Sequence, residues 1–204
     1  MAMSVREVDI GPCSARAFEQ DGARRWTVIL PGAGYSTEAP LLWYAREAAL
    51  AAGLNALAVA DRFDRATDNP TEWVRGRTLA ALRHVESADA HPLLIAKSLT
   101  SLAAGEAAEH GLSAVWLTPL INGRGSSVAD EVRAALQGSA APSLLIGGTA
   151  DPTWDGAFAR SLAHAHVVEL SGADHSLQVS GDPQRSLTHL TAVTARVSEF
   201  IAAL

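Results

Sequence analysis

The chain has 204 residues, of which 48% are hydrophobic and 19% are charged, and its formal net charge is −6. This length suits one domain over residues 1–204, with enough apolar material for a core and too little charge for a disordered chain. An acidic chain without a basic stripe is a poor match for nucleic acid. No uncharged apolar stretch reaches the roughly 18 residues of a membrane span, and the most apolar one, around 92–104, carries Lys97. We therefore expect neither nucleic acid nor a membrane as a partner.

The chain contains one cysteine, Cys13, and its first residues form no apolar run of signal-peptide length. A single cysteine makes neither an intrachain disulfide nor a thiolate metal cluster, which fits a reducing compartment. No His, Asp and Glu residues are clustered at the spacing of metal ligands either. We therefore expect a cytoplasmic protein without a metal site.

Short apolar runs alternate with Ala- and Leu-rich segments along the chain. Residues 5–10 and 15–19, around Gly11 and Pro12, predict an antiparallel hairpin at one edge of a sheet. Further strands are predicted at 27–30, 54–60, 93–96, 114–117, 144–146 and 166–170. Several of these runs are apolar throughout rather than alternating, which is typical of parallel strands covered on both faces.

Helices are predicted between these strands. They are expected at 37–52, 72–87, 99–110, 126–137 and 184–203. Strands that alternate with helices of this length indicate an α/β fold, with a mostly parallel central sheet and helices on both faces. Ligands of such sheets bind at the carboxyl ends of the strands, so the candidate functional residues are expected directly after each strand.

The first informative strand end is Pro31-Gly32-Ala33-Gly34-Tyr35. Two glycines after a buried strand permit a tight turn and leave backbone N–H groups free for an anion or an oxyanion. A dinucleotide-binding loop, G-x-G-x-x-G, is an alternative, with Asp61 as the acid that would bind a ribose. The third glycine of that motif is replaced by Thr37. A plain turn between strand and helix is the remaining alternative to the anion or oxyanion site.

The second informative strand end is Ala96-Lys97-Ser98-Leu99-Thr100, where a strand runs directly into a helix. A serine on such a corner fits a nucleophile elbow, whose sharp turn lifts the hydroxyl clear of the sheet. Small residues are expected two places before and after the serine. Ala96 departs mildly from this rule, and the β-branched Thr100 departs further. Lys97-Ser98 also resembles the end of a phosphate-binding loop, but the glycines of that motif are missing. A purely structural alternative is that Ser98 caps the helix.

The third and fourth strand ends supply an aspartate and a histidine. Asp151 follows a buried strand and two glycines, and its alternative role is to cap the next helix, a role that Asp155 fits better. His175 lies in the loop between the last strand and the last helix. The six other histidines of the chain are at helical positions, helix ends or strand starts.

The order of these features along the chain is informative, because Ser, then Asp, then His is the triad order of α/β-hydrolases. From about residue 24 to 204 the chain resembles the α/β-hydrolase superfamily. It looks most like small lidless members with the elbow G-K-S-[LM]-G and the acid loop G-T-x-D, here Gly148-Thr149-Ala150-Asp151. The resemblance implies Ser98 as nucleophile, His175 as general base and Asp151 as the residue that orients it. The backbone N–H groups of Leu99 and Ala33 are the expected oxyanion hole.

The resemblance also bears on the substrate. Larger relatives carry a lid after the strand that follows the nucleophile helix, and the gap at 120–125 is too short for one, so we expect no lid domain and an open, shallow site. Arg124 is either an anion-binding residue or solvated surface. Asp174 receives no catalytic role, because adjacent side chains usually point apart. The residues expected around the substrate, either as walls or as plain packing, are Gly34, Tyr35, Leu120 and Trp154.

The leading functional hypothesis is a serine hydrolase that cleaves a small ester or thioester through an acyl-enzyme, without a cofactor. Its partner is a small-molecule substrate. The alternative is a non-hydrolytic use of the same fold, either a small-molecule binding protein or a lyase or isomerase with His175 as its base. A nucleotide-binding Rossmann-type domain is a third interpretation.

Overall fold

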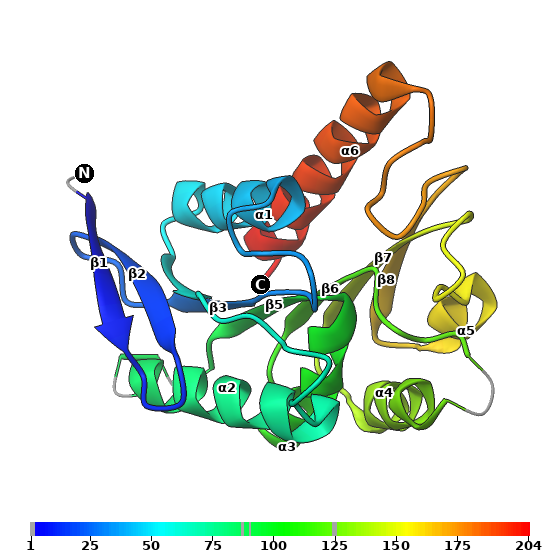
Figure 1. Ribbon diagram of the computed structural model, residues 1–204. Coiled ribbons are helices and arrows are strands. Elements are labelled where there is room, and N and C mark those ends of the chain that lie inside the picture. The colour runs from blue at the N-terminus through cyan, green and yellow to red at the C-terminus, as the bar shows by residue number, and fades with distance from the viewer. Residues whose placement is uncertain (1–2, 87, 90, 124–125) are drawn as a thin grey trace.

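The structure is a computed structural model that describes residues 3–86, 88–89, 91–123 and 126–204. Its centre is an eight-stranded sheet in the order β1-β2-β4-β3-β5-β6-β7-β8 (Figure 1). The strands are β1 (Met3–Asp9), β2 (Ser14–Gln20), β3 (Trp26–Leu30), β4 (Asn55–Val59), β5 (Leu93–Lys97), β6 (Ala114–Leu117), β7 (Ser143–Gly148) and β8 (Ala165–Leu170). The predicted strand positions are thus confirmed to within a few residues.

The sheet is parallel except at its N-terminal edge. β1 pairs with β2 and β2 pairs with β4 in antiparallel fashion, while the remaining neighbours are parallel. All residues of β3, β4, β5, β6 and β7 are buried. Continuous burial explains why these strands are apolar throughout, since helices cover both faces of the sheet.

The helices form two layers, one on each face of the sheet. Their bounds are α1 (Pro40–Ala51), α2 (Pro70–Val85), the 3₁₀ helix η1 (Ser98–Ala103), α3 (Ala104–Glu109), α4 (Ser127–Gly138), α5 (Gly156–Ser161) and α6 (Pro183–Ala202). α1 and α6 lie together above the sheet in Figure 1, and α2, α3 and α4 lie below it. Each layer packs its own apolar cluster against the strands. The predicted fold class is therefore confirmed.

Local signals account for several helix boundaries. The side chain of Asn69 accepts a hydrogen bond from the N–H of Glu72 at the start of α2, and Asp182 does the same for Arg185 in α6. Asp155 caps α5 by accepting the N–H of Phe158 at 2.9 Å. The structure thus bears out the expectation that Asp155 suits this capping role.

Two helices differ from their predicted form. The segment expected as one helix at 99–110 begins with six residues of 3₁₀ helix before α3. The apolar residues of α6 recur at spacings of mostly three or four, which predicts one buried stripe. Val193, Val197, Phe200 and Ile201 are buried, but Leu187 is 58% exposed because the first turns of the helix extend beyond the sheet. An amphipathic pattern predicts a helix but not the extent of the surface that covers it.

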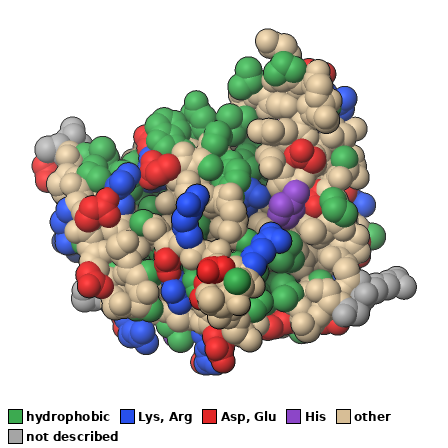
Figure 2. Space-filling model, viewed as in Figure 1, with side chains coloured by type: hydrophobic (Ala, Val, Ile, Leu, Met, Phe, Trp, Pro, Cys, Tyr) green, Lys and Arg blue, Asp and Glu red, His purple; other side chains and the backbone are tan. Residues whose placement is uncertain are grey.

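The surface carries few large apolar side chains. Hydrophobic side chains gather over α1 in the space-filling view, where Trp43 and Tyr44 are 36% and 41% exposed (Figure 2). Within the described part of the chain, no helix is both long enough and apolar enough to cross a membrane.

Candidate active site

The turn after β5 places Ser98 in an unusual backbone conformation. Its φ is 56°, in the left-handed region that residues other than glycine rarely adopt. Ala96 and Thr100 on either side are buried. The hydroxyl of Thr100 accepts the N–H of Lys97 at 3.1 Å and lies 3.1 Å from the carbonyl oxygen of Lys97. The turn therefore accommodates a β-branched residue where a small one is expected, because its hydroxyl bonds to the turn itself.

The loop after β3 passes close to Ser98. A Cβ atom built on Gly32 would lie 3.4 Å from the carbonyl oxygen of Lys97 and 3.6 Å from Cβ of Ser98. Gly32 and Tyr35 exchange both backbone hydrogen bonds, at 2.8 and 3.3 Å. Ala33 and Gly34 therefore form the tip of a tight turn beside Ser98, and their N–H groups take no part in the bonds that close it.

Three side chains from three segments that follow β5, β7 and β8 meet at the carboxyl ends of the strands. Nε2 of His175 lies 2.7 Å from Oγ of Ser98, and Nδ1 of His175 lies 2.8 Å from Oδ2 of Asp151. The structure thus brings together the residues expected as a triad. A hydroxyl, an imidazole and a carboxylate linked in this order can activate the hydroxyl as a nucleophile.

The carboxylate of Asp151 is fully buried and held by a neighbour that the sequence did not reveal. Its Oδ1 accepts hydrogen bonds from the N–H and the hydroxyl of Thr153, at 2.9 and 2.8 Å. Burial alone would raise the pKa of Asp151, but the hydrogen bonds from His175 and Thr153 outweigh it and hold the pKa below its usual range. Asp151 is therefore ionised at neutral pH. A Thr two residues after an Asp in a turn is the signal that could have identified Thr153.

Two glycines at the end of β7 allow close packing around Asp151, and one of them meets the loop of His175. A Cβ on Gly147 would overlap the indole of Trp154, and a Cβ on Gly148 would overlap the carbonyl of Ala173. Ala173 lies two residues before His175, and its carbonyl accepts the N–H of Ala150 at 3.0 Å. The glycines of the acid loop are therefore needed for close approach rather than for an unusual φ.

We expect the substitution Gly148→Ala to lower the free energy of unfolding by about 1–3 kcal/mol, because a methyl group has no space beside the Ala173 backbone. Gly105→Ala is the matched control. Gly105 lies in α3 with nothing within 4 Å of its added Cβ, so this variant should gain roughly 0.5–1 kcal/mol. Urea denaturation of the three proteins measures both changes, and equal stability of the two variants would contradict the close packing of the two loops.

Lys97 occupies the position before Ser98, and its side chain is buried beneath the site. Its Nζ donates to the hydroxyl of Thr118 and to the carbonyl of His175, each at 3.0 Å, and lies 4.6 Å from the ring centre of Tyr35. Burial lowers the pKa of Lys97 to about 8, although the carboxylates of Asp151 and Asp174 act in the opposite direction. The lone charge of Lys97 within the apolar stretch 92–104 is the sequence signal that points to a buried ammonium group at this position.

The residues expected around the substrate differ in how far they are buried. Tyr35 and Leu120 are half-buried, and the hydroxyl of Tyr35 accepts the N–H of Leu41 at 2.9 Å. Trp154 is only 6% exposed and donates from its indole nitrogen to Glu169 at 2.7 Å. Its ring packs in the core, which favours plain packing, the second of the two roles expected for it, over a place in the wall of the site. Arg124 lies outside the described residues.

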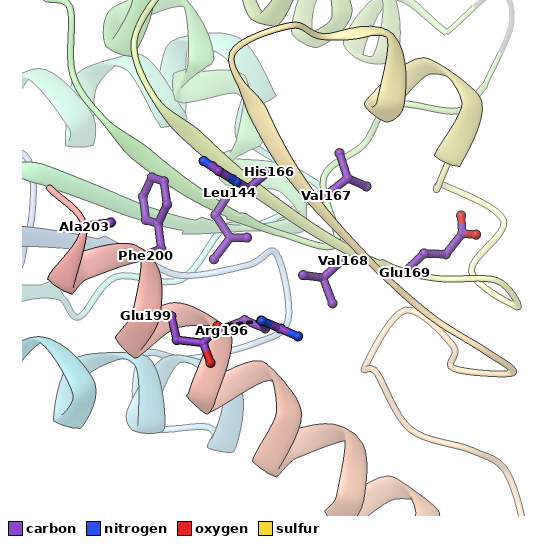
Figure 3. Close-up of a pocket in the computed structure, with 9 residues that line it drawn as sticks. All are labelled: Leu144, His166, Val167, Val168, Glu169, Arg196, Glu199, Phe200 and Ala203. Carbon is purple, nitrogen blue, oxygen red and sulfur yellow. Dashed lines mark hydrogen bonds and ion pairs between the residues drawn. The ribbon is translucent and has the colours of Figure 1, made fainter.

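The acidic residue of the alternative dinucleotide-binding motif has another partner in the structure. Asp61, the residue that a dinucleotide site would use for ribose, forms an ion pair with Arg77 at 2.7 Å. The cavity drawn in Figure 3 lies between β8 and the end of α6, and Ser98 is not among the residues that line it. Arg196 and Glu199, which do line it, form an ion pair at 2.6 Å. Among the described residues, no group of three or more His, Cys, Asp or Glu side chains is placed to hold a metal ion.

Comparisons with known proteins extend this picture. No family model matches the chain, and no curated protein does. Among solved structures, Est1E from Butyrivibrio proteoclasticus is similar with a TM-score of 0.73 at 14% identity, over 98% of each chain. A dienelactone hydrolase from Anabaena variabilis matches with a TM-score of 0.73 at 20% identity, over 99% of this chain and 97% of its own. An α/β serine hydrolase without a lid from Xanthomonas campestris matches with a TM-score of 0.69 at 15% identity, over 98% and 94%.

The chain has the α/β-hydrolase fold. In α/β-hydrolases the nucleophile stands on the sharp turn between a strand and a helix, and the N–H of the next residue points into the oxyanion hole. In this chain Ser98 lies on the turn between β5 and η1, and Leu99 is the residue that follows it. β6 ends at Leu117 and α4 begins at Ser127, which leaves no room for a lid domain between them.

Proposed function

We propose that this chain is a serine hydrolase that cleaves a small ester or thioester. The observation that carries the proposal is the hydrogen-bonded series from Ser98 through His175 to Asp151, with Ser98 on a strained turn at the end of β5. The α/β-hydrolase fold supports it, as does the similarity to structures described as an esterase, a dienelactone hydrolase and a serine hydrolase.

In the proposed reaction, Oγ of Ser98 attacks the carbonyl carbon of the ester while Nε2 of His175 takes the hydroxyl proton. The negative charge that develops on the carbonyl oxygen is stabilised by the N–H groups of Leu99 and Ala33. His175 then returns the proton to the leaving alcohol or thiol, and an acyl-Ser98 ester remains. A water molecule activated by His175 hydrolyses this ester. Asp151 stays ionised throughout and stabilises the imidazolium.

The absence of a lid supports a small substrate. The proposed binding surface consists of the turn at Gly34 and the half-buried side chains of Tyr35 and Leu120. The N–H of Leu120 donates to Oγ of Ser101 at 3.1 Å, and this hydroxyl donates to the carbonyl of Ser98 at 2.7 Å. The wall at Leu120 is therefore tied to the nucleophile turn, which favours a fixed, short acyl site.

A fluorophosphonate probe tests the proposal without knowledge of the natural substrate. We expect the folded protein to form one covalent adduct, located on Ser98 by peptide mass spectrometry, because only a hydroxyl activated by a base reacts with this electrophile. Heat-unfolded protein is the control and should remain unlabelled. A folded protein that never reacts would overturn the hydrolase proposal and favour a binding protein or a lyase of the same fold.

A further inference from the structure

The buried ammonium group of Lys97 connects three loops of the site. Lys97 is the last residue of β5 and is 2% exposed. Its Nζ contacts the hydroxyl of Thr118 after β6, the carbonyl of His175 after β8, and the ring of Tyr35 after β3. The proposed reaction has no step for this group, so its presence beneath the triad requires a separate explanation.

Packing alone does not account for a lysine at this position. A buried ammonium group loses its hydration, which is unfavourable unless good hydrogen-bond partners replace the water. The ionisable side chains that face Lys97 are those of Asp151, Asp174 and Tyr35, and His175 contacts it through its backbone carbonyl. An apolar side chain of similar length would fill the same space without this penalty, so the ammonium group itself is the informative feature.

The loop that carries His175 shows what the ammonium group does. Asp174 organises the rest of this loop, since its side chain accepts the N–H groups of Ser176 and Gln178, at 2.8 and 3.0 Å. The carbonyl of His175 instead accepts its hydrogen bond from Lys97, at 3.0 Å. Lys97 therefore anchors the main chain of the histidine to the strand that carries the serine.

We propose that Lys97 is a positioning residue, whose ammonium group holds the backbone of His175 so that the imidazole spans the distance between Ser98 and Asp151. This inference rests on the proposed hydrolase function and deepens it. The charge contributes to the role, because a hydrogen bond from an ammonium group is shorter and stronger than one from a neutral amine. The hold should weaken when Lys97 loses its proton, near pH 8.

The substitution Lys97→Met tests the inference, because methionine fills a similar volume without a donor. With p-nitrophenyl acetate we expect kcat to fall about 10- to 100-fold and KM to change little, since a small misplacement of a catalytic group has an effect of this size. The wild type should also lose activity above about pH 8, and the Lys97→Met protein should lack this alkaline decline. A residue with only a structural role would not move the pH profile.

A second variant, Thr118→Val, keeps Lys97 and removes one of its two hydrogen-bond acceptors. Loss of this acceptor should lower the pKa of Lys97 further and shift the alkaline decline to lower pH, so the inference stays testable even if Lys97→Met does not fold. If the wild type is active and either folded variant has the wild-type kcat and pH profile, the positioning role is overturned and the hydrolase proposal is not. A wild type that neither hydrolyses esters nor reacts with a fluorophosphonate overturns the hydrolase proposal together with it.

Discussion

Replacement of Ser98 by alanine is expected to lower kcat/KM for p-nitrophenyl acetate by about 10⁴- to 10⁶-fold, because the variant loses the atom that forms the acyl-enzyme. The fold should survive the change. The hydroxyl of Ser98 bonds to His175, whereas the turn around it is held by Thr100 and Ser101, whose hydroxyls bond to the backbone of Lys97 and Ser98. Circular dichroism and thermal unfolding should therefore show a folded protein whose initial rate of nitrophenol release is near background.

Ser198→Ala provides the matched control for this measurement. Ser198 is an exposed serine of α6, and its hydroxyl donates to the carbonyl of Thr194 at 3.0 Å. Because Ser198 takes no part in the candidate site, the same chemical change there should leave kcat/KM unchanged. Ester hydrolysis that persists in purified Ser98→Ala protein at the wild-type rate would show that another group is the nucleophile.

The architecture could be predicted because its signals are local. Burial on both faces makes the central strands apolar throughout, and glycine marks the ends of helices whose next residue needs a positive φ. Gly53 and Gly111 come directly after the helices predicted at 37–52 and 99–110, and their φ values of 81° and 64° are ones that glycine adopts easily. The order of the strand ends then identified which loops meet, since parallel strands bring their carboxyl ends to one edge.

The surroundings of the candidate site were harder to predict, because they depend on contacts between distant segments. Lys97 contacts the carbonyl of a residue 78 positions away, and no local pattern specifies such a partner. Trp154 is a large aromatic residue of the kind that lines pockets, yet its ring packs in the core against Gly147, where a side chain would leave no room for it. Thr100 departs from the small residue expected at the turn, but the free N–H of Lys97 gives its hydroxyl a partner.

Replacement of Asp151 by asparagine is expected to lower kcat/KM by about 10⁴-fold, with little change in stability. Thr153 determines how the new side chain lies. Its N–H and hydroxyl both donate to Oδ1, so the amide oxygen of Asn takes this place and the amide nitrogen faces Nδ1 of His175. Nδ1 must then accept a hydrogen bond from this amide. The imidazole proton therefore moves to Nε2, the nitrogen that faces Oγ of Ser98. In this tautomer His175 has no lone pair for the serine proton, and the negative charge that stabilises the imidazolium is also lost.

Asp182→Asn is the matched control for the same chemical change. Asp182 caps α6 by accepting the N–H of Arg185 at 2.9 Å, and Asn caps a helix about as well as Asp. This variant should therefore retain wild-type kcat/KM and stability. The two variants are compared through the rate of nitrophenol release and through fluorophosphonate labelling at equal protein concentration. An Asp151→Asn protein that keeps more than a tenth of wild-type activity would show that His175 does not depend on this carboxylate, and the basic group of the mechanism would have to be oriented by another contact.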